Sequence, residues 1–403
     1  MASSKPPFDA GGVVEGAAWD ALCRSIVDAR ALVLGAGVPG SDRDRAEGFR
    51  YLLRFLASGI AVCMEAADTE HPEFMRMIDR GRTWGLDCPD CLYLQAGVRG
   101  DACYRIFGSR GSANHLDLQV NFGHFALGDI SKWGTIDSLN GLELEVEADG
   151  RFEVFLGGEA RPRNWLRLAP EAEFVLVRQY FNDWERERPA DLLIERLDAP
   201  ASAPPPEPDE IGARLERLVS WLEKGGALWE QMSRSMWELP PNTLNVFHTP
   251  SSDERAGMRG QAYGMGNFRC PEGEAVIVEF SPPACHHWSV SLATWYWEAI
   301  DFASRQSSLN GHQAELDSDG VFRGVIAHQD PGVPNWLDAS GHERGTLAAR
   351  FLLADSAPTP VLRQVPLAEL ARALPAGTPR LAPTERKARL TARRRAALGR
   401  YRR

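Results

Sequence analysis

The sequence predicts a mainly β protein with a helical layer (α+β), built as two strand-rich lobes of the β-sandwich type. The chain has 403 residues, whereas single hydrophobic cores stop growing near ~250–300 residues, so two domains are expected. Short apolar runs separated by turn residues fill two blocks, residues 90–197 and 274–366. A proline cluster lies between these blocks and predicts an exposed connection over residues 198–208.

Helical periodicity precedes each block. Apolar residues recur at helical spacing over residues 13–34 and 42–67, and Asp42 is the expected N-cap of the second helix. A third helix is predicted over residues 211–239, interrupted at Gly225-Gly226 because glycine weakens a helix by ~1 kcal/mol per residue. We expect this helix to pack across the junction of the lobes.

The first block predicts seven strands, with a tight hairpin at Asp149-Gly150. These strands are residues 92–94, 103–107, 115–122, 142–146, 152–156, 174–180 and 192–197. In the second block the clearest strands are residues 276–278, 288–292 and 321–327, the last of which follows a turn at Asp317–Gly320. No internal repeat is strong enough to predict a duplication, although the two blocks could be distant copies.

Charge and cysteine usage limit the classes of function. The segment Thr384–Arg403 has nine Lys and Arg against one acid, a net charge of +8. Because the whole chain has a net charge of −10, the other 383 residues carry −18. An acidic body disfavours nucleic acid as the main partner. The basic tail, residues 376–403, is expected to be solvated; contact with a membrane surface or a nucleic acid is the alternative.

The expected location is cytoplasmic. The N-terminus lacks the apolar run of a signal peptide, and the most apolar stretch, residues 60–64, is too short to span a bilayer. Seven scattered cysteines fit a reducing compartment better than a disulfide framework. The domains predicted are an N-terminal lobe over residues 1–197 and a C-terminal lobe over residues 209–375.

The familiar nucleotide and hydrolase motifs are missing, so no organic cofactor is expected. The sequence has no phosphate-binding glycine loop, no GxSxG nucleophile elbow and no support for a Rossmann fold. Cys88-Pro-Asp-Cys91 has the spacing of a metal knuckle or a redox pair, but no further ligands follow nearby and the pair precedes a strand. We therefore predict a structural turn and no metal. His286 and His287 point to opposite faces of a strand and cannot chelate one ion together.

The most informative stretch is residues 326–342, at the end of a predicted strand. Asp330, Asp338 and His328 are candidates for acid–base catalysis there. The candidates for binding substrate in this stretch are Asn335, Trp336 and His342. A rigid turn explains the same residues, if the aspartates cap backbone amides and the Trp plugs the end of the sandwich.

A second polar segment follows the strand that ends near residue 293. Asp301 is the catalytic candidate in this segment, with Trp297, Arg305 and Asn310 as substrate-binding candidates. Core packing of Trp297 and a buried structural network of the polar residues are the alternatives. We expect the aspartates and asparagines of both segments to meet around one concave pocket with Trp336 in its wall, where two carboxyls ~5–10 Å apart could act as acid and base.

Several short motifs of the sequence resemble those of the domain of unknown function 1214 family. Over about residues 266–370 they are Pro282-Pro-Ala-Cys285, Trp288-Ser-Val-Ser-Leu292, Glu298-Ala-Ile-Asp301, Ser308-Leu-Asn310 and residues 326–342. Upstream they are Phe49-Arg-Tyr-Leu-Leu-Arg54, Pro89-Asp-Cys-Leu-Tyr93 and Arg178-Gln-Tyr-Phe-Asn-Asp-Trp184. The resemblance implies two β-sandwich or jelly-roll-like lobes with a helical layer, in bacterial proteins, and carries no agreed catalytic residues. One departure, cysteines flanking Pro89-Asp90 where asparagine is expected, further weakens a metal interpretation.

The leading functional hypothesis is a small-molecule enzyme, a hydrolase or lyase that uses carboxylate and histidine acid–base chemistry on a glycan-like or anionic substrate. A non-catalytic small-molecule-binding protein is the alternative, and a scaffold recruited through the basic tail is a third class. The sequence predicts no oligomeric state.

Overall fold

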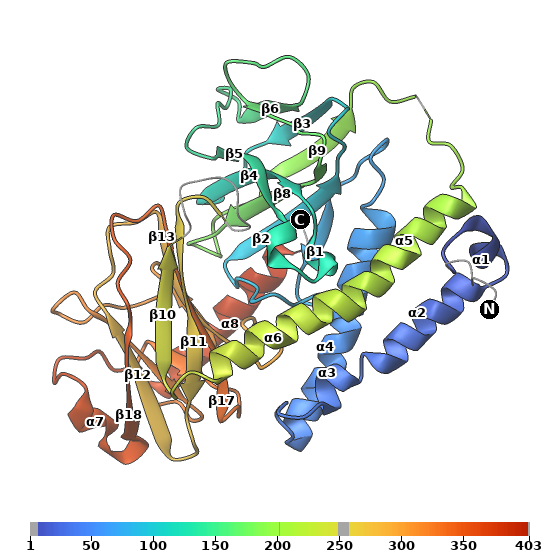
Figure 1. The fold of residues 1–403 in the computed structure, drawn as a ribbon. Helices are drawn as coiled ribbons and strands as arrows, with labels where there is room; N and C mark the ends of the chain where they lie inside the picture. Colours follow the sequence, from blue (N-terminus) through green and yellow to red (C-terminus); the bar gives the residue numbers. More distant parts are fainter. Residues whose placement is uncertain (1–6, 201, 249–257, 402–403) are drawn as a thin grey trace.

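The computed structural model describes residues 7–200, 202–248 and 258–401 and has the predicted mainly β architecture with a helical layer (Figure 1). Each of the two lobes pairs a five-stranded sheet with a four-stranded sheet. The connection between the lobes, residues 198–208, is largely exposed wherever it is described, as the proline cluster predicts.

The N-terminal lobe has the strand orders β1-β2-β8-β4-β5 and β7-β6-β3-β9. Its strands are β1 Met75–Ile78, β2 Cys91–Gly97, β3 Tyr104–Ser109, β4 His115–Phe122, β5 Gly134–Asn140, β6 Arg151–Leu156, β7 Trp165–Leu166, β8 Ala172–Tyr180 and β9 Asp191–Arg196. Their inward side chains form one apolar core between the two sheets.

The C-terminal lobe has the strand orders β10-β11-β17-β13-β14 and β16-β15-β12-β18. Its strands are β10 Thr243–His248, β11 Gln261–Arg269, β12 Glu274–Phe280, β13 His287–Ala293, β14 Ser308–Asn310, β15 Phe322–Ala327, β16 Trp336–Asp338, β17 Arg344–Leu352 and β18 Val361–Pro366. A second core lies between these two sheets.

The second lobe repeats the first strand for strand, with β1 corresponding to β10 and so on to β9 and β18. Side-chain contacts repeat as well. Asn164 accepts from the backbone N–H of Glu145 at 2.9 Å and donates to its carbonyl at 2.8 Å, and Asn335 does the same with Glu315 at 2.9 and 2.6 Å. The chain is therefore a tandem duplication of one sandwich.

One predicted strand, residues 142–146, is wrong. The strand before the Asp149-Gly150 turn is β5, which pairs with β4. After β5 the chain turns, because the side chain of Asn140 accepts from the N–H of Leu142 at 2.9 Å and its carbonyl accepts from the N–H of Leu144 at 3.1 Å. These local hydrogen bonds form a turn in place of the strand-to-strand hydrogen bonds that the alternation of apolar residues predicts for residues 142–146.

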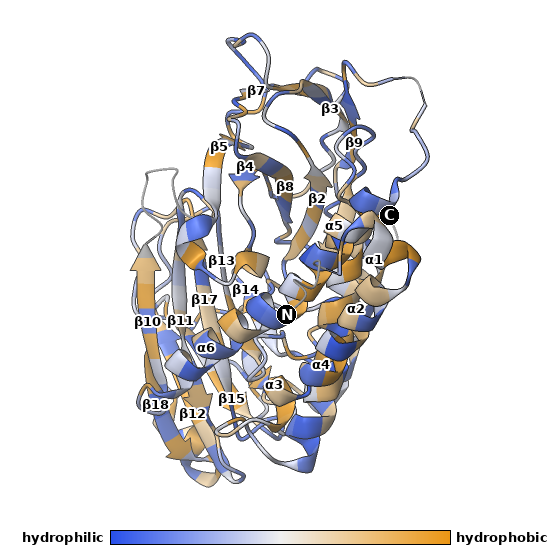
Figure 2. Cartoon of the chain, turned by 45° about the vertical axis from the view of Figure 1, so that its right-hand side comes forward, coloured by the Kyte–Doolittle hydropathy of each residue, from blue (hydrophilic) through white to orange (hydrophobic). Residues whose placement is uncertain are grey.

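The helical layer packs along one side of both lobes (Figure 2). It consists of α1 Ala10–Val14, α2 Ala17–Asp28, α3 Ala31–Leu34, α4 Asp42–Ile60 with the π-helical segment η1 Ala61–Glu65, and α5 Pro208–Ser220, the π-helical segment η4 Trp221–Gly225 and α6 Gly226–Trp237. The N-cap of α4 is Ser41, whose hydroxyl accepts from the N–H of Asp44 at 3.1 Å, and not Asp42 as predicted. Gly225-Gly226 lies where the π-helix η4 passes into α6, so the helix continues through the two glycines instead of being interrupted there as predicted.

The junction of the lobes holds its own apolar core. Trp221 and Trp229 of the long helix pack there with Leu176 of the first lobe and Ala348 of the second. The helix thus crosses the junction, as expected from its place between the two strand-rich blocks.

The predicted solvated tail is instead the docked helix α8, Pro383–Arg400, which lies between the lobes (red in Figure 1). Arg386 pairs with Asp330 at 3.0 Å and is almost fully buried. Arg393 donates to Ser308 of the second lobe at 2.6 Å and stacks 4.5 Å from the ring of Trp184 of the first. Arg386 and Arg400 can be buried because a guanidinium group can satisfy carbonyls and aromatic faces at once, which a residue count does not reveal.

Two simple findings complete the fold. All seven cysteines are free thiols. None of the helices in the described ranges has both the length and the apolar composition that crossing a bilayer requires.

Candidate functional site

The structure does not gather the predicted catalytic aspartates around one pocket. Asp330 accepts from the N–H of Gly332 at 2.9 Å and pairs with Arg386, while Asp338 accepts from the N–H of Ser340 at 2.8 Å and pairs with Arg305 at 2.8 Å. Asp301 accepts from the N–H groups of Ala303 and Ser304 at 3.2 and 3.1 Å. Capping of local backbone therefore describes all three.

Most of the other predicted residues also have structural contacts. His328 is hydrogen-bonded through Nε2 to the carbonyl of Cys270 at 2.7 Å. Trp336 donates to the carbonyl of Ala327 at 2.9 Å, as Trp165 does to that of Gly157 at 2.9 Å in the first lobe. Because Asn335 and Trp336 repeat the contacts of Asn164 and Trp165, their roles belong to the sandwich fold. Trp297 packs in the junction core, 5.8 Å from the ring of Trp229.

Three predicted residues do share a polar cavity of about 240 Å³: Asp301, Arg305 and His342. Part of its charge is paired within the protein. Arg54 pairs with Glu298, and His342 lies 3.0 Å from Glu47. Arg50 and Arg80 also line this cavity and form no ion pair among the described residues, so it keeps some positive charge.

A second cavity, of about 170 Å³, lies between the five-stranded sheets of the two lobes. Strands β2 and β8 line it from one lobe, and β11 and β17 from the other. Its apolar lining residues are Met77, Ile78, Trp84, Leu86, Phe125, Trp133, Phe174, Leu176 and Trp229. Its polar lining residues are Asp87, Tyr93, Gln95, Asn121, His124, Arg178, Tyr180, Gln261, Tyr263 and Arg350.

Each lobe contributes the same tyrosine–arginine pair to this cavity. Tyr93 stands opposite Arg178 in the register of β2 and β8, and Tyr263 stands opposite Arg350 in that of β11 and β17. The hydroxyls of Tyr93 and Tyr263 accept from backbone N–H groups at 3.2 and 3.3 Å. The duplication therefore places two guanidinium groups and two phenols around one space.

The two arginines differ in their partners. Arg178 donates to Gln119 and lies 3.8 Å from the carboxylate of Asp117, its neighbour on β4. The position that corresponds to Asp117 in the second lobe holds Ser289. Arg350 is only 4% exposed and donates to the carbonyl of Leu86 and, at 3.3 Å, to the hydroxyl of Ser291. No carboxylate in the described part of the chain lies within 4.0 Å of this guanidinium.

A buried charge without a counterion costs several kcal/mol. Arg350 therefore favours an anion in the cavity that it lines. Asp87, which lines the same cavity, interacts with Arg350 through space without forming an ion pair. Asp87 accepts from the N–H of Ala299 at 2.8 Å, and burial raises the pKa of its carboxyl to about 7.

Further hydrogen-bond donors line the cavity without a protein partner in the described residues. They are the indole N–H groups of Trp133 and Trp229 and Nε2 of His124. Nδ1 of His124 accepts from the N–H of Ala126 at 3.2 Å, so the ring proton is on Nε2. Burial lowers the pKa of His124 well below its ordinary value, which keeps the ring neutral. The cavity thus offers mainly donors and suits a ligand rich in acceptor oxygens.

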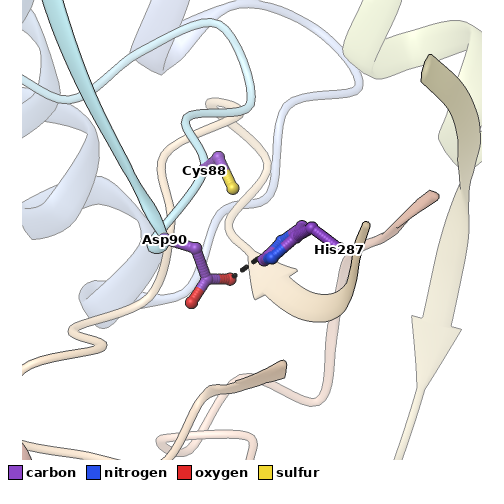
Figure 3. Close-up of side chains that lie close together, drawn as sticks. All are labelled: Cys88, Asp90 and His287. Carbon is purple, nitrogen blue, oxygen red and sulfur yellow. Dashed lines mark ion pairs between the residues drawn. The ribbon is translucent and has the colours of Figure 1, made fainter. Parts of the chain in front are cut away.

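One group of described residues could hold a metal ion. Cys88, Asp90 and His287 each present a ligand atom within 4.8 Å of the others (Figure 3). The predicted residue Asn310 lies beside this group and donates to Asp90 at 2.7 Å.

Sequence reasoning missed the tyrosines and arginines of the cavity. They sit singly on four strands that are far apart in the chain, and each follows ordinary strand alternation. Superposing the two copies is the signal that finds them, because Cys91-Leu-Tyr93 and Gln261-Ala-Tyr263 then coincide.

The fold and this cavity define a tandem β-sandwich protein with a ligand-sized space between its two copies. The chain belongs to the family of an uncharacterized protein from Burkholderia cenocepacia, whose crystal structure it matches with a TM-score of 0.85 at 30% identity, over 89% of this chain and 99% of that one. The VPA0106 protein from Vibrio parahaemolyticus has a TM-score of 0.45 at 13% identity, over 84% of this chain and 100% of that one, too low to support an argument. No family model and no curated protein sequence matches significantly.

Proposed function

We propose that the cavity between the lobes binds a small organic anion, a carboxylate carried on one ring or a short apolar body. The observation that supports this most strongly is that the buried cation Arg350 has no carboxylate partner among the described residues. The aromatic wall would hold the apolar body. An engineered cavity of ~150 Å³ binds benzene, so a space of about 170 Å³ suits a ligand of about one ring.

Replacing Arg350 with Met is expected to weaken carboxylate binding by about 10- to 100-fold, because a charge-assisted hydrogen bond contributes about 1.5–3 kcal/mol. Binding can be followed through the fluorescence of Trp84, Trp133 and Trp229, which line the cavity. The ligand panel should pair aromatic and short aliphatic carboxylates with their primary amides, which keep the shape and lose the charge.

Arg163→Met is the matched control, since Arg163 forms an exposed ion pair with Glu145 on the surface of the first lobe. This variant should bind carboxylates as the wild type does. Equal affinity for acids and amides, or an Arg350→Met protein that retains full affinity, would contradict the proposal.

The second candidate is an enzyme that performs acid–base chemistry, of the hydrolase or lyase type, on the same anion. The observation that favours it is the position of Asp87, the one carboxyl group among the described residues that line the cavity. The apolar wall favours an organic anion over a glycan as substrate.

The free thiols support our proposal of a cytoplasmic location.

Asp87→Asn separates the two candidates. An enzyme should lose at least about 100-fold in kcat, because general acid–base catalysis contributes about 10²–10⁴-fold. A binding protein should keep its carboxylate affinity within a few fold and show no turnover in either form. Turnover of a bound acid that is unchanged in Asp87→Asn would rule out this role for Asp87. The measurement is product formation by mass spectrometry from each acid that binds.

A further inference from the structure

We infer that Cys88, Asp90 and His287 form a binding site for one divalent metal ion of the zinc class, which joins the two lobes. Cys88 and Asp90 lie in the loop that leads into β2 of the first lobe, and His287 begins β13 of the second. Figure 3 shows the three side chains pointing toward one another. All three are at least nine-tenths buried.

The protonation of His287 leaves a lone pair directed at this group. Nδ1 of His287 is 2.6 Å from the amide oxygen of Asn182. The amide nitrogen of Asn182 donates to the carbonyl of His286 at 3.3 Å, which fixes the orientation of the amide. Because an amide oxygen only accepts, the ring proton is on Nδ1, and Nε2 has no hydrogen-bond partner among the described residues. A histidine oriented through one nitrogen and free at the other is the usual arrangement of a metal ligand.

Asp90 presents a second acceptor to the same space. Its Oδ1 accepts from the indole of Trp184 at 2.8 Å and from Asn310 at 2.7 Å. Its Oδ2 has no hydrogen-bond partner in the part of the chain that the structure describes and lies 3.8 Å from Nε2 of His287. Two buried acceptors that face each other require a shared cation or proton, since an unmatched buried polar group costs ~1–3 kcal/mol.

The donor set selects the ion. A thiolate, an imidazole and a carboxylate together suit zinc and its neighbours, and exclude Mg²⁺ and Ca²⁺, which prefer oxygen ligands. Ionised Cys88 and Asp90 would neutralise a divalent charge inside the protein. Three protein ligands leave one tetrahedral position for water or another small ligand.

The duplication supplies an internal comparison. In the second lobe, Met258 and Gly260 occupy the positions of Cys88 and Asp90, and the same backbone bonds form around them: the N–H of Cys91 donates to Cys88 at 3.0 Å, and that of Gln261 to Met258 at 3.2 Å. His115 occupies the position of His287. The equivalent set of Met258, Gly260 and His115 therefore lacks the thiol and the carboxylate, so the three donors come together at one of the two related positions between the lobes.

The test is the metal content of full-length protein produced with added zinc and purified without chelators, together with a cobalt(II) titration. We expect one equivalent of metal and a thiolate-to-cobalt charge-transfer band in the near ultraviolet. Cys88→Ser and His287→Gln should each weaken cobalt binding at least about 100-fold. Asn182→Ala, which frees His287 without removing a ligand, should weaken it about 10-fold.

His115→Gln and Cys91→Ser are the controls, and both should keep one equivalent of metal. Circular dichroism of every variant establishes that it is folded. Substoichiometric metal in folded wild-type protein would show that the buried acceptors share a proton and would overturn the inference. So would loss of metal in Cys91→Ser with retention in His287→Gln, which would indicate a two-cysteine knuckle, or a Cys88–Cys91 disulfide in the purified protein.

Discussion

Trp221→Ala is expected to lower the free energy of unfolding by about 3–5 kcal/mol, because it removes a large aromatic side chain from a packed core. Trp221 is 0% exposed. Its ring lies 4.4–5.2 Å from the rings of Phe55, Trp84, His124 and Phe125, and its indole donates to the carbonyl of Phe55 at 3.0 Å. Trp221 joins the helical layer to the junction between the lobes, so its removal should destabilise both the helical layer and the junction.

Guanidinium unfolding, followed by circular dichroism and by Trp fluorescence, measures this change. Trp19→Ala is the control: Trp19 lies on α2 and is 62% exposed, so its loss should change stability by less than about 0.5 kcal/mol. If Trp221→Ala does not fold, Trp221→Phe should show a smaller loss in the same direction. Equal effects of Trp19→Ala and Trp221→Ala would mean that the junction core is not tightly packed.

The stabilising contribution of His342 is expected to disappear as the pH rises from about 6.5 to 9. Its Nε2 lies 3.0 Å from Glu47, and its Nδ1 lies 3.8 Å from Asp44, both on α4. Burial opposes protonation, but the two carboxylates outweigh it and raise the pKa of His342 to about 9. The unfolded value is ~6.5, so below that pH histidine is protonated in both states and the full contribution, about 3 kcal/mol, is present. Above pH 9 the folded state also loses the proton and the contribution is gone.

The carboxylates of Asp44 and Glu47 determine how the ion pairs behave at acidic pH. His342 lowers the pKa of Asp44, and it also lowers that of Glu47 against the effect of burial. Their contribution is present above their unfolded pKa values and is lost as the pH falls further into the acid range. The difference in melting temperature between wild type and His342→Gln should therefore be largest near pH 5–6 and shrink toward pH 9. A difference that stays constant over this range would contradict the ion-pair assignment.

Much of the fold could be predicted because its causes are local. Residues 115–122 alternate in a way that matches β4 at both ends, and the helix over residues 211–239 has its apolar stripe where the junction core needs it. The sequence left the duplication only as a possibility, although Ser138-Leu-Asn-Gly141 recurs as Ser308-Leu-Asn-Gly311 and Asn164-Trp-Leu166 as Asn335-Trp-Leu337. These repeated motifs are short, because only the residues that fix turns and corners are kept in both copies, whereas core residues can be replaced by other apolar residues.

The candidate site was harder to predict, and the reason is physical. Polar loop residues such as Asp330 and Asp338 attract attention in a sequence, yet a short carboxylate beside a turn bonds most readily to backbone N–H groups two residues away. Arg350 and Tyr263 lie on ordinary alternating strands. Nothing in their local sequence tells which face of the strand borders a cavity.

The sequence by itself determined the two lobes, the exposed connection and the helices, because these follow from apolar periodicity and from proline and glycine, which act over a few residues. Only the tertiary structure decided which charges are buried and what they face. Contacts between distant strands and between the lobes decide that Asp117 pairs with Arg178 while Arg350 has no such partner among the described residues. Such contacts also bring His287 close to Cys88 and Asp90. The free energy of a buried charge depends on its neighbours in space, and those neighbours are set only when the two copies pack together.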